Sequence, residues 1–162
     1  MLRLTLPVLV SILVATGAFA EESDRIKEIT VEMDLTAIVN PLAAKRFGTL
    51  ATDLQGAIAA RLVDRIGEEG RKLSVDISEA ELSNAFTEAA GLAETKLVGL
   101  VHVTDENDNT HFNTYTLTVT VENARVFFPV GLDETTLTAT SDVYYSALIS
   151  AFAEAVAVRI DD

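Results

Sequence analysis

The chain has 162 residues, no cysteine and a formal net charge of −13, from 25 acidic and 12 basic side chains. Without cysteine it has no disulfide framework, no thiolate metal site and no attachment point for an N-terminal lipid. The negative charge repels phosphate backbones and anionic lipid head groups, which argues against nucleic-acid binding and against direct lipid binding.

The N-terminal segment has the pattern of a bacterial secretory signal peptide. Arg3 gives a short basic region, residues 4–17 are almost wholly apolar, and Ala18-Phe19-Ala20 places small residues at the positions that a signal peptidase inspects. A retained membrane anchor is the alternative, but Pro7 interrupts the run, and the run is short for a bilayer crossing of about 20 apolar residues. We therefore expect cleavage after Ala20, a periplasmic or secreted location, no transmembrane segment thereafter, and a single domain formed by residues 21–162.

Alternation with a period of two predicts a strand over residues 26–36 with one solvated face. Its apolar face carries Ile29, Val31, Met33 and Leu35. A long helix is expected over residues 41–66, because Asn40 is a capping residue, Pro41 suits a first helical turn, and apolar residues then recur every three to four positions. The recurring residues are Phe47, Leu50, Leu54, Ile58, Leu62 and Ile66. Gly67 is the expected C-terminal stop of this helix.

The alternation returns after the turn at residues 67–70 and predicts a second strand around residues 73–77. Its inward side chains are Leu73, Val75 and Ile77. A strand, a helix and a strand in succession form a crossover unit, so we expect the two strands to be parallel and to lie in one sheet. Residues 79–95 fit either a short helix or a continuation of the strand to Leu82 followed by a loop.

A hairpin is expected in the second half of the chain. Residues 96–104 are apolar on both faces, which is typical of a central strand, and residues 105–110 form a polar loop. Residues 112–127 are the longest predicted strand, with threonines on the solvated face. The inward side chains are Tyr115, Leu117, Val119 and Val121. Pro129 and Gly131 interrupt the pattern, so the hairpin ends before them.

A final helix is expected from a cap at Ser141 to about Ile160. Its polar residues fall in one narrow stripe, so most of its circumference is apolar and has to be buried on more than one side. Packing between the first helix and the sheet is the favoured interpretation, and contact with a second subunit or a partner protein is the alternative. Under that alternative the contact residues are Tyr144, Tyr145, Leu148 and Phe152.

Taken in chain order, the elements predict an α+β fold of two layers. The expected sheet is mixed and has about four strands, in the order strand, helix, strand, strand, strand, helix. The two long helices are expected to pack on one face of this sheet.

The two histidines, His102 and His111, flank the polar loop that contains Asp105 and Asp108. If His111 faces Thr104 across the hairpin, the histidines are diagonal neighbours on one face and close enough to hold a metal ion together with the loop carboxylates. A one-residue change of register places them on opposite faces, so the alternative is that neither histidine has a metal role.

Other catalytic and cofactor-binding patterns are missing from the sequence. The loop at residues 105–110 begins like an EF-hand, but Thr110 and Thr116 stand where that motif needs glycine and a carboxylate. The chain has no cysteine nucleophile, no Gly-x-Ser-x-Gly motif and no glycine-rich phosphate loop, and no spacing distinguishes a carboxylate pair among the 25 acids. We expect no catalytic activity and no cofactor. A metal- or small-ligand-binding protein that uses residues 102–111 is one alternative, and an unrecognised carboxylate-dependent hydrolase is another.

The element order of residues 26–160 resembles that of small periplasmic α/β modules of envelope assembly. The two families are the lipopolysaccharide-assembly lipoprotein and the N-terminal domain of the Tol-system β-propeller protein. The chain departs from the first of them because it has no cysteine to carry a lipid. The resemblance implies a non-catalytic part that docks onto another envelope protein. The expected partner is such a protein or a second copy of the chain, bound through a sheet edge or through the final helix.

Overall fold

The computed structural model describes residues 25–33, 48–81, 96–105, 112–134, 137 and 141–160. The predicted signal peptide at residues 1–20 and residues 82–95 of the ambiguous segment 79–95 lie outside this part of the chain. Residues 79–81 continue the second strand, as one of the two interpretations of that segment expects. The elements are β1 (Ile26–Met33), α2 (Leu50–Arg61), η2 (Val63–Arg65), β2 (Arg71–Glu81), β3 (Lys96–Thr104), β4 (Phe112–Thr120), α4 (Val121–Ala124), η4 (Arg125–Phe127) and α5 (Asp142–Arg159), where η marks a 3₁₀-helix.

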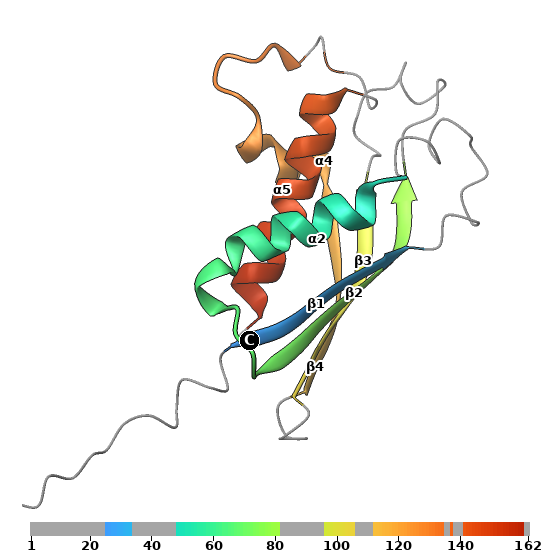
Figure 1. The fold of residues 1–162 in the computed structure, drawn as a ribbon. Coiled ribbons are helices and arrows are strands. Elements are labelled where there is room, and N and C mark those ends of the chain that lie inside the picture. Colours follow the sequence, from blue (N-terminus) through green and yellow to red (C-terminus); the bar gives the residue numbers. More distant parts are fainter. Residues whose placement is uncertain are drawn as a thin grey trace, which may run out of the picture.

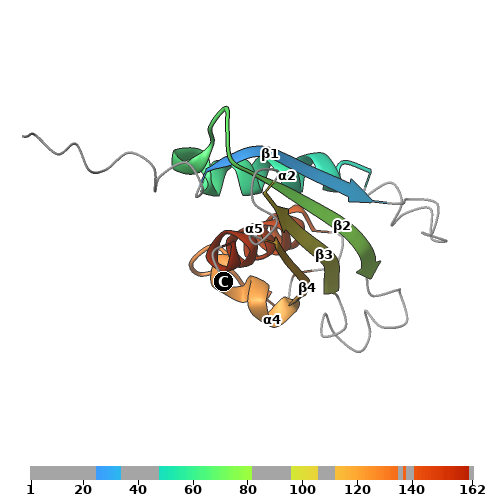
Figure 2. The same cartoon turned by 90° about the horizontal axis from the view of Figure 1, so that it is seen from below.

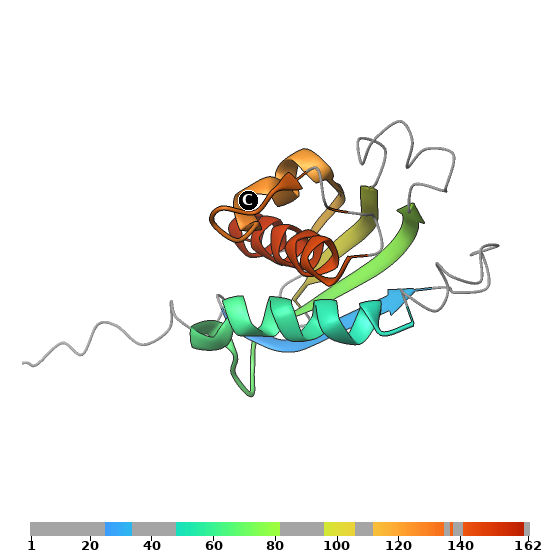
Figure 3. The ribbon, with the colours of Figure 1, turned by 90° about the horizontal axis from the view of Figure 1, so that it is seen from above.

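The strands form one mixed sheet in the order β1-β2-β3-β4. β1 and β2 are parallel, whereas β2 with β3 and β3 with β4 are antiparallel, so both the crossover and the hairpin are confirmed. α2 and α5 cross in front of the same face of the sheet (Figures 1 and 3). The α+β fold, the element order and the two-layer arrangement are therefore as the sequence predicts.

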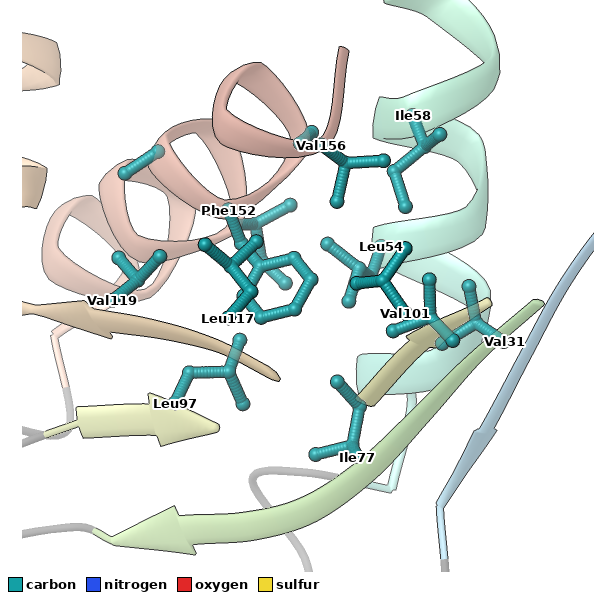
Figure 4. Packing of buried hydrophobic residues seen from close by; sticks show 14 of the residues in the cluster. Val31, Leu54, Ile58, Ile77, Leu97, Val101, Leu117, Val119, Phe152 and Val156 are labelled. Carbon is teal, nitrogen blue, oxygen red and sulfur yellow. The ribbon is translucent and has the colours of Figure 1, made fainter. Parts of the chain in front are cut away.

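One face of the sheet forms the core with the helices. The register places Val31, Val75 and Val101 side by side on β1, β2 and β3, and all three are buried. Phe152 of α5 and Leu54 of α2 point into the same space from the helical layer (Figure 4). Burying a large apolar side chain contributes about 1.5–3 kcal/mol, so this single cluster supplies most of the driving force for folding.

The first long helix is shorter than the sequence predicts. α2 ends at Arg61, and the tighter turn η2 follows. Ile66 then takes an extended conformation and forms a parallel bridge with Ile26 next to β1, which removes Ile66 from the helix. The range 41–66 is therefore wrong at its C-terminal end. At the other end, α2 begins only at Leu50, after a turn at residues 48–49, and residues 41–47 lie outside the described residues.

The predicted strand over residues 112–127 is also too long. β4 ends at Thr120, where a capping box begins α4: the Thr120 backbone N–H donates to Asn123 Oδ1 at 3.0 Å, and the Thr120 side chain accepts from the Asn123 backbone N–H. Val121 remains buried, but inside a helix. The apolar alternation therefore runs past the end of the strand and does not mark it.

The final helix, α5, is buried on several sides, as its composition predicts. Ser141 Oγ caps it by accepting a backbone N–H of the first turn at 3.2 Å. The helix packs against α2, β3, β4, α4 and η4. Two polar groups of α5 bond to α2: Glu154 Oε2 accepts from Arg61 Nε at 2.9 Å, and the Tyr145 hydroxyl donates to Asp53 Oδ2 at 2.7 Å. Among the described helices, none has the length and apolarity needed to cross a bilayer.

Candidate functional site

The face of the sheet opposite α2 and α5 carries polar side chains. The register aligns them in rows, with Thr30 beside Ser74, Ser74 beside His102, and His102 beside Thr114. A shallow hollow of about 470 Å³ lies over β1, β2 and β3 on this face. It is lined by Glu28, Thr30, Glu32, Lys72, Leu73, Ser74, Val75, Asp76, His102 and Thr104.

The charged groups of this hollow are exposed to solvent. Lys72 Nζ lies 3.3 Å from Glu28 Oε2, and Glu32 lies directly opposite Asp76 in the parallel pair of β1 and β2. Exposed ion pairs of this kind contribute only about 0–1 kcal/mol. The groups therefore give the hollow an acidic character without contributing much to stability.

The pairing of β3 with β4 differs from the pairing that the predicted metal site requires. Thr104 pairs with Phe112, so His111 is not the residue that faces Thr104. His102 pairs with Thr114, and its Nδ1 lies 3.0 Å from Thr114 Oγ1. Asp108 and His111 lie outside the described residues, as does the calcium-like part of the loop, and Asp105 is half-buried after β3. Within the described ranges no three His, Asp or Glu side chains gather closely enough to hold a metal ion.

The four residues considered as a contact surface on the final helix face mainly inward. Tyr144, Leu148 and Phe152 are at most 2% exposed within this one chain, so they belong to the core. Tyr145 is half-buried and bonds to Asp53 of α2. These side chains pack against the first helix and the sheet, which was the favoured interpretation. A partner protein has no access to the three buried ones.

β4 is an edge strand with an unusual composition. It lies at one end of the sheet, with β3 as its only strand neighbour in the described chain (Figure 2). Its nine residues, FNTYTLTVT, include no charged side chain, no proline and no glycine, and its pairing with β3 has no bulge. Thr114, Thr116 and Thr118 are exposed, and Phe112 is 63% exposed. Edge strands with these properties are competent to pair with a further strand, because nothing on them opposes it.

The other edge of the sheet is protected. β1 carries Lys27, Glu28 and Glu32 along its eight residues, and its pairing with β2 shifts register between Ile26 and Glu28. Charges and irregularities of this kind are the usual protection of an edge strand against unwanted pairing. The two edges, at opposite ends of the sheet in Figure 2, therefore differ in their ability to pair with a further strand.

The sequence pattern alone does not mark β4 as an edge strand open to pairing. The uncharged run is visible in the sequence, but it has this meaning only once the strand order places it at an edge. A run of nine residues without charge in a chain of net charge −13 is the signal that was available.

Comparison with known proteins gives remote structural likenesses only. No protein-family model matches the chain, and no curated protein is similar to it. It is similar to a DUF330-family protein from Xanthomonas campestris, at 12% identity and a TM-score of 0.48, over 89% of this chain and 88% of that one. It is also similar to a PelC variant dodecamer from Paraburkholderia phytofirmans, at 12% identity and a TM-score of 0.40, over 81% of this chain and 87% of that one. A minor lipoprotein from Acinetobacter baumannii follows at 16% identity and a TM-score of 0.37, over 83% and 91%. None of the three carries the name of the lipopolysaccharide-assembly or Tol-system families, and likenesses at this level transfer no functional residue to this chain.

Proposed function

We propose that the protein is a non-catalytic binding module of the bacterial envelope that joins its partner by adding a strand at the β4 edge. The envelope location rests on the predicted signal peptide at residues 1–20. The observation that carries the binding mode is the uncharged, exposed and regular β4 strand at the end of the sheet. In strand addition, main-chain hydrogen bonds give the affinity and side chains on alternate positions give the specificity.

The exposure of the acidic groups supports a role without catalysis. Glu28, Glu32 and Asp76 all lie on the open sheet face and are exposed. Catalytic carboxyl groups usually lie inside a concave, shielded site, and these three lie exposed on an open sheet face. His102 Nδ1 lies 3.0 Å from the Thr114 hydroxyl, so this nitrogen bonds to a hydroxyl group where a catalytic triad has a carboxylate.

Site-specific photo-crosslinking in cells of the native host tests the binding mode. A photoreactive amino acid is placed at Thr118 on β4, at Thr30 on the open face near the other edge, or at Gln55 on the exposed side of α2. We expect a discrete adduct from Thr118 only. The further change Thr116→Lys is expected to reduce this adduct, because a charge on the edge opposes strand addition.

Adducts from Thr30 or Gln55 at the same yield would contradict the proposal, as would the absence of any adduct from Thr118. An adduct from Thr30 alone would point to the hollow of about 470 Å³ on the open face, the site of the alternative small-ligand function. The two proposals are thus separated by the position of the crosslink.

Excess Zn²⁺ or Ca²⁺ is expected to leave the melting temperature unchanged, because His102 already bonds to Thr114 and no cluster of three ligands occurs in the described residues. A bound metal at 100 times its Kd would stabilise the folded state by about 2.7 kcal/mol, which a thermal melt detects readily. The control is the same melt in EDTA. A metal-dependent rise that disappears in His102→Ala would restore the metal-binding alternative.

A further inference from the structure

We infer that the strand which pairs with β4 is β4 of a second copy of this chain, an inference that rests on the proposed edge-binding function. The two copies meet as an antiparallel pair related by a two-fold axis, so that two four-stranded sheets become one continuous sheet of twice the size. The same surface then serves both partners, as in any two-fold symmetric interface.

The register of such a pair follows from the pattern of the strand. Even-numbered residues of β4 lie on the open face, where Thr114, Thr116 and Thr118 are exposed, while Leu117 and Val119 are buried against the helices. In the full-length antiparallel register, residue numbers of opposed positions add up to 232, so Thr116 faces its own copy. Even positions then oppose even positions, and the helical layers of both copies lie on one side of the combined sheet.

The opposed pairs on the open face are compatible in this register. On the open face Thr114 lies opposite Thr118, and Phe112 lies opposite Thr120, which covers an aromatic ring that is 63% exposed in the single chain. Pairs of threonines and pairs of an aromatic with a β-branched residue are favourable cross-strand neighbours. No charged side chain of β4 enters the pair, because the strand has none.

The β1 edge is unfavourable for pairing with its own copy. Full-length antiparallel overlap of β1 with its own copy sets Ile26 opposite Met33 and so opposes residues from different faces of the sheet. The face-matched register centred on Thr30 places Glu28 opposite Glu32 at two positions, and like charges directly opposite one another are destabilising. The fold therefore directs self-association to β4 and away from β1.

Net charge sets the conditions under which the pair forms. The full chain carries a formal charge of −13, and removal of residues 1–20 with Arg3 leaves it still strongly negative, so two copies repel one another at long range. An uncharged strand is where they meet with least repulsion. Salt screens this repulsion, with a Debye length of about 10 Å at 0.1 M. Because a strand pair alone is a small interface, we expect a dissociation constant in the micromolar range that decreases as salt is added.

A single cysteine at the axis tests the register directly, since the natural chain has none. Opposed Cα atoms in an antiparallel pair lie about 4.5–5.5 Å apart, within the range that a disulfide spans. Purified mature Thr116→Cys is expected to form a covalent dimer under mild oxidation, whereas Thr52→Cys on α2 and Thr30→Cys on β1 remain monomeric. Sedimentation of the natural protein is expected to show a monomer–dimer equilibrium that shifts towards dimer as NaCl is raised.

The variant Thr116→Lys is expected to weaken dimerisation at least about tenfold while its thermal melt and circular dichroism stay those of the natural protein, since position 116 is exposed in the single chain. A natural protein that stays monomeric at high concentration and high salt overturns the inference, as does a dimer that Thr30→Cys crosslinks and Thr116→Cys does not. A monomer that still gives a Thr118 adduct with a different protein in cells overturns the second copy as partner and leaves the proposed function in place. Absence of both dimer and adduct removes the two together.

Discussion

Replacement of Gly70 by alanine is expected to lower the free energy of unfolding by about 3 kcal/mol or more, since a residue other than glycine in a rarely populated conformation costs about 1–3 kcal/mol and a backbone clash adds to that strain. Gly70 has φ +130°, a conformation that L side chains rarely adopt, and a Cβ there would lie 2.3 Å from the Arg25 carbonyl oxygen. That carbonyl accepts a hydrogen bond from the Arg71 N–H at 2.8 Å, so the contact cannot open without loss of the link between β1 and β2. Chemical denaturation measures the change, and the melting temperature should decrease by roughly 10 °C.

Two other glycines provide matched controls. Gly131 has φ +82° and open space around it, so Gly131→Ala introduces strain without a clash and is expected to cost about 1 kcal/mol. Gly56 lies within α2 with open space, so Gly56→Ala is expected to stabilise the protein by about 0.5–1 kcal/mol. Equal effects of Gly70→Ala and Gly131→Ala would show that the close approach to Arg25 has no energetic weight.

Truncation of Phe152 to alanine is expected to lower the free energy of unfolding by about 3–5 kcal/mol, because the ring is fully buried and its loss leaves a cavity. The space for this ring exists because β3 carries glycine at position 99. A Cβ at Gly99 would lie 2.9 Å from Phe152 Cζ, 3.0 Å from Ile77 Cδ1 and 3.3 Å from Val75 Cγ1. Gly99→Ala is therefore expected to cost about 1–3 kcal/mol through overpacking.

The size match between Gly99 and Phe152 is tested by a double-mutant cycle. Phe152→Leu removes the atom that meets the added Cβ. The loss of unfolding free energy in the double variant with Gly99→Ala should therefore be smaller than the sum of the losses in the two single variants by at least about 0.5 kcal/mol. The m-value of the urea transition should stay constant across the set. Strictly additive effects would mean that the sheet moves to accept the methyl group and that the ring does not determine the residue at position 99.

The sequence predicts those features of the fold that depend on local periodicity. Leu73, Val75 and Ile77 alternate as a half-buried strand, and they are buried on one face of β2. The end of β4 was not predicted, because Val119 and Val121 keep the alternation while the Thr120–Asn123 capping box turns the chain into a helix. A helix-start signal inside a strand pattern competes with the strand pattern, and tertiary packing decides whether the strand continues or the helix begins.

The candidate site depends on strand order and strand register, which the periodicity of the sequence does not reveal. A pattern such as that of residues 112–120 indicates a strand, but not which neighbours it has, so it does not reveal that β4 is an edge. Likewise, the spacing of His102 and His111 is compatible with two hairpin registers that differ by one residue. The metal hypothesis requires Thr104 to face His111, whereas in the structure Thr104 faces Phe112. Strand order and register are set by the turn and by tertiary packing, which lie beyond the reach of residue patterns.

The position of α5 in the chain has a consequence for the timing of folding. This helix is the last described element, and it fills the core between α2 and the sheet, with Phe152 and Val156 fully buried. A nascent chain that has not yet reached Asp142 has α2 to cover part of the apolar sheet face, but the part that α5 covers stays exposed. The core is therefore complete only after α5 has been synthesised.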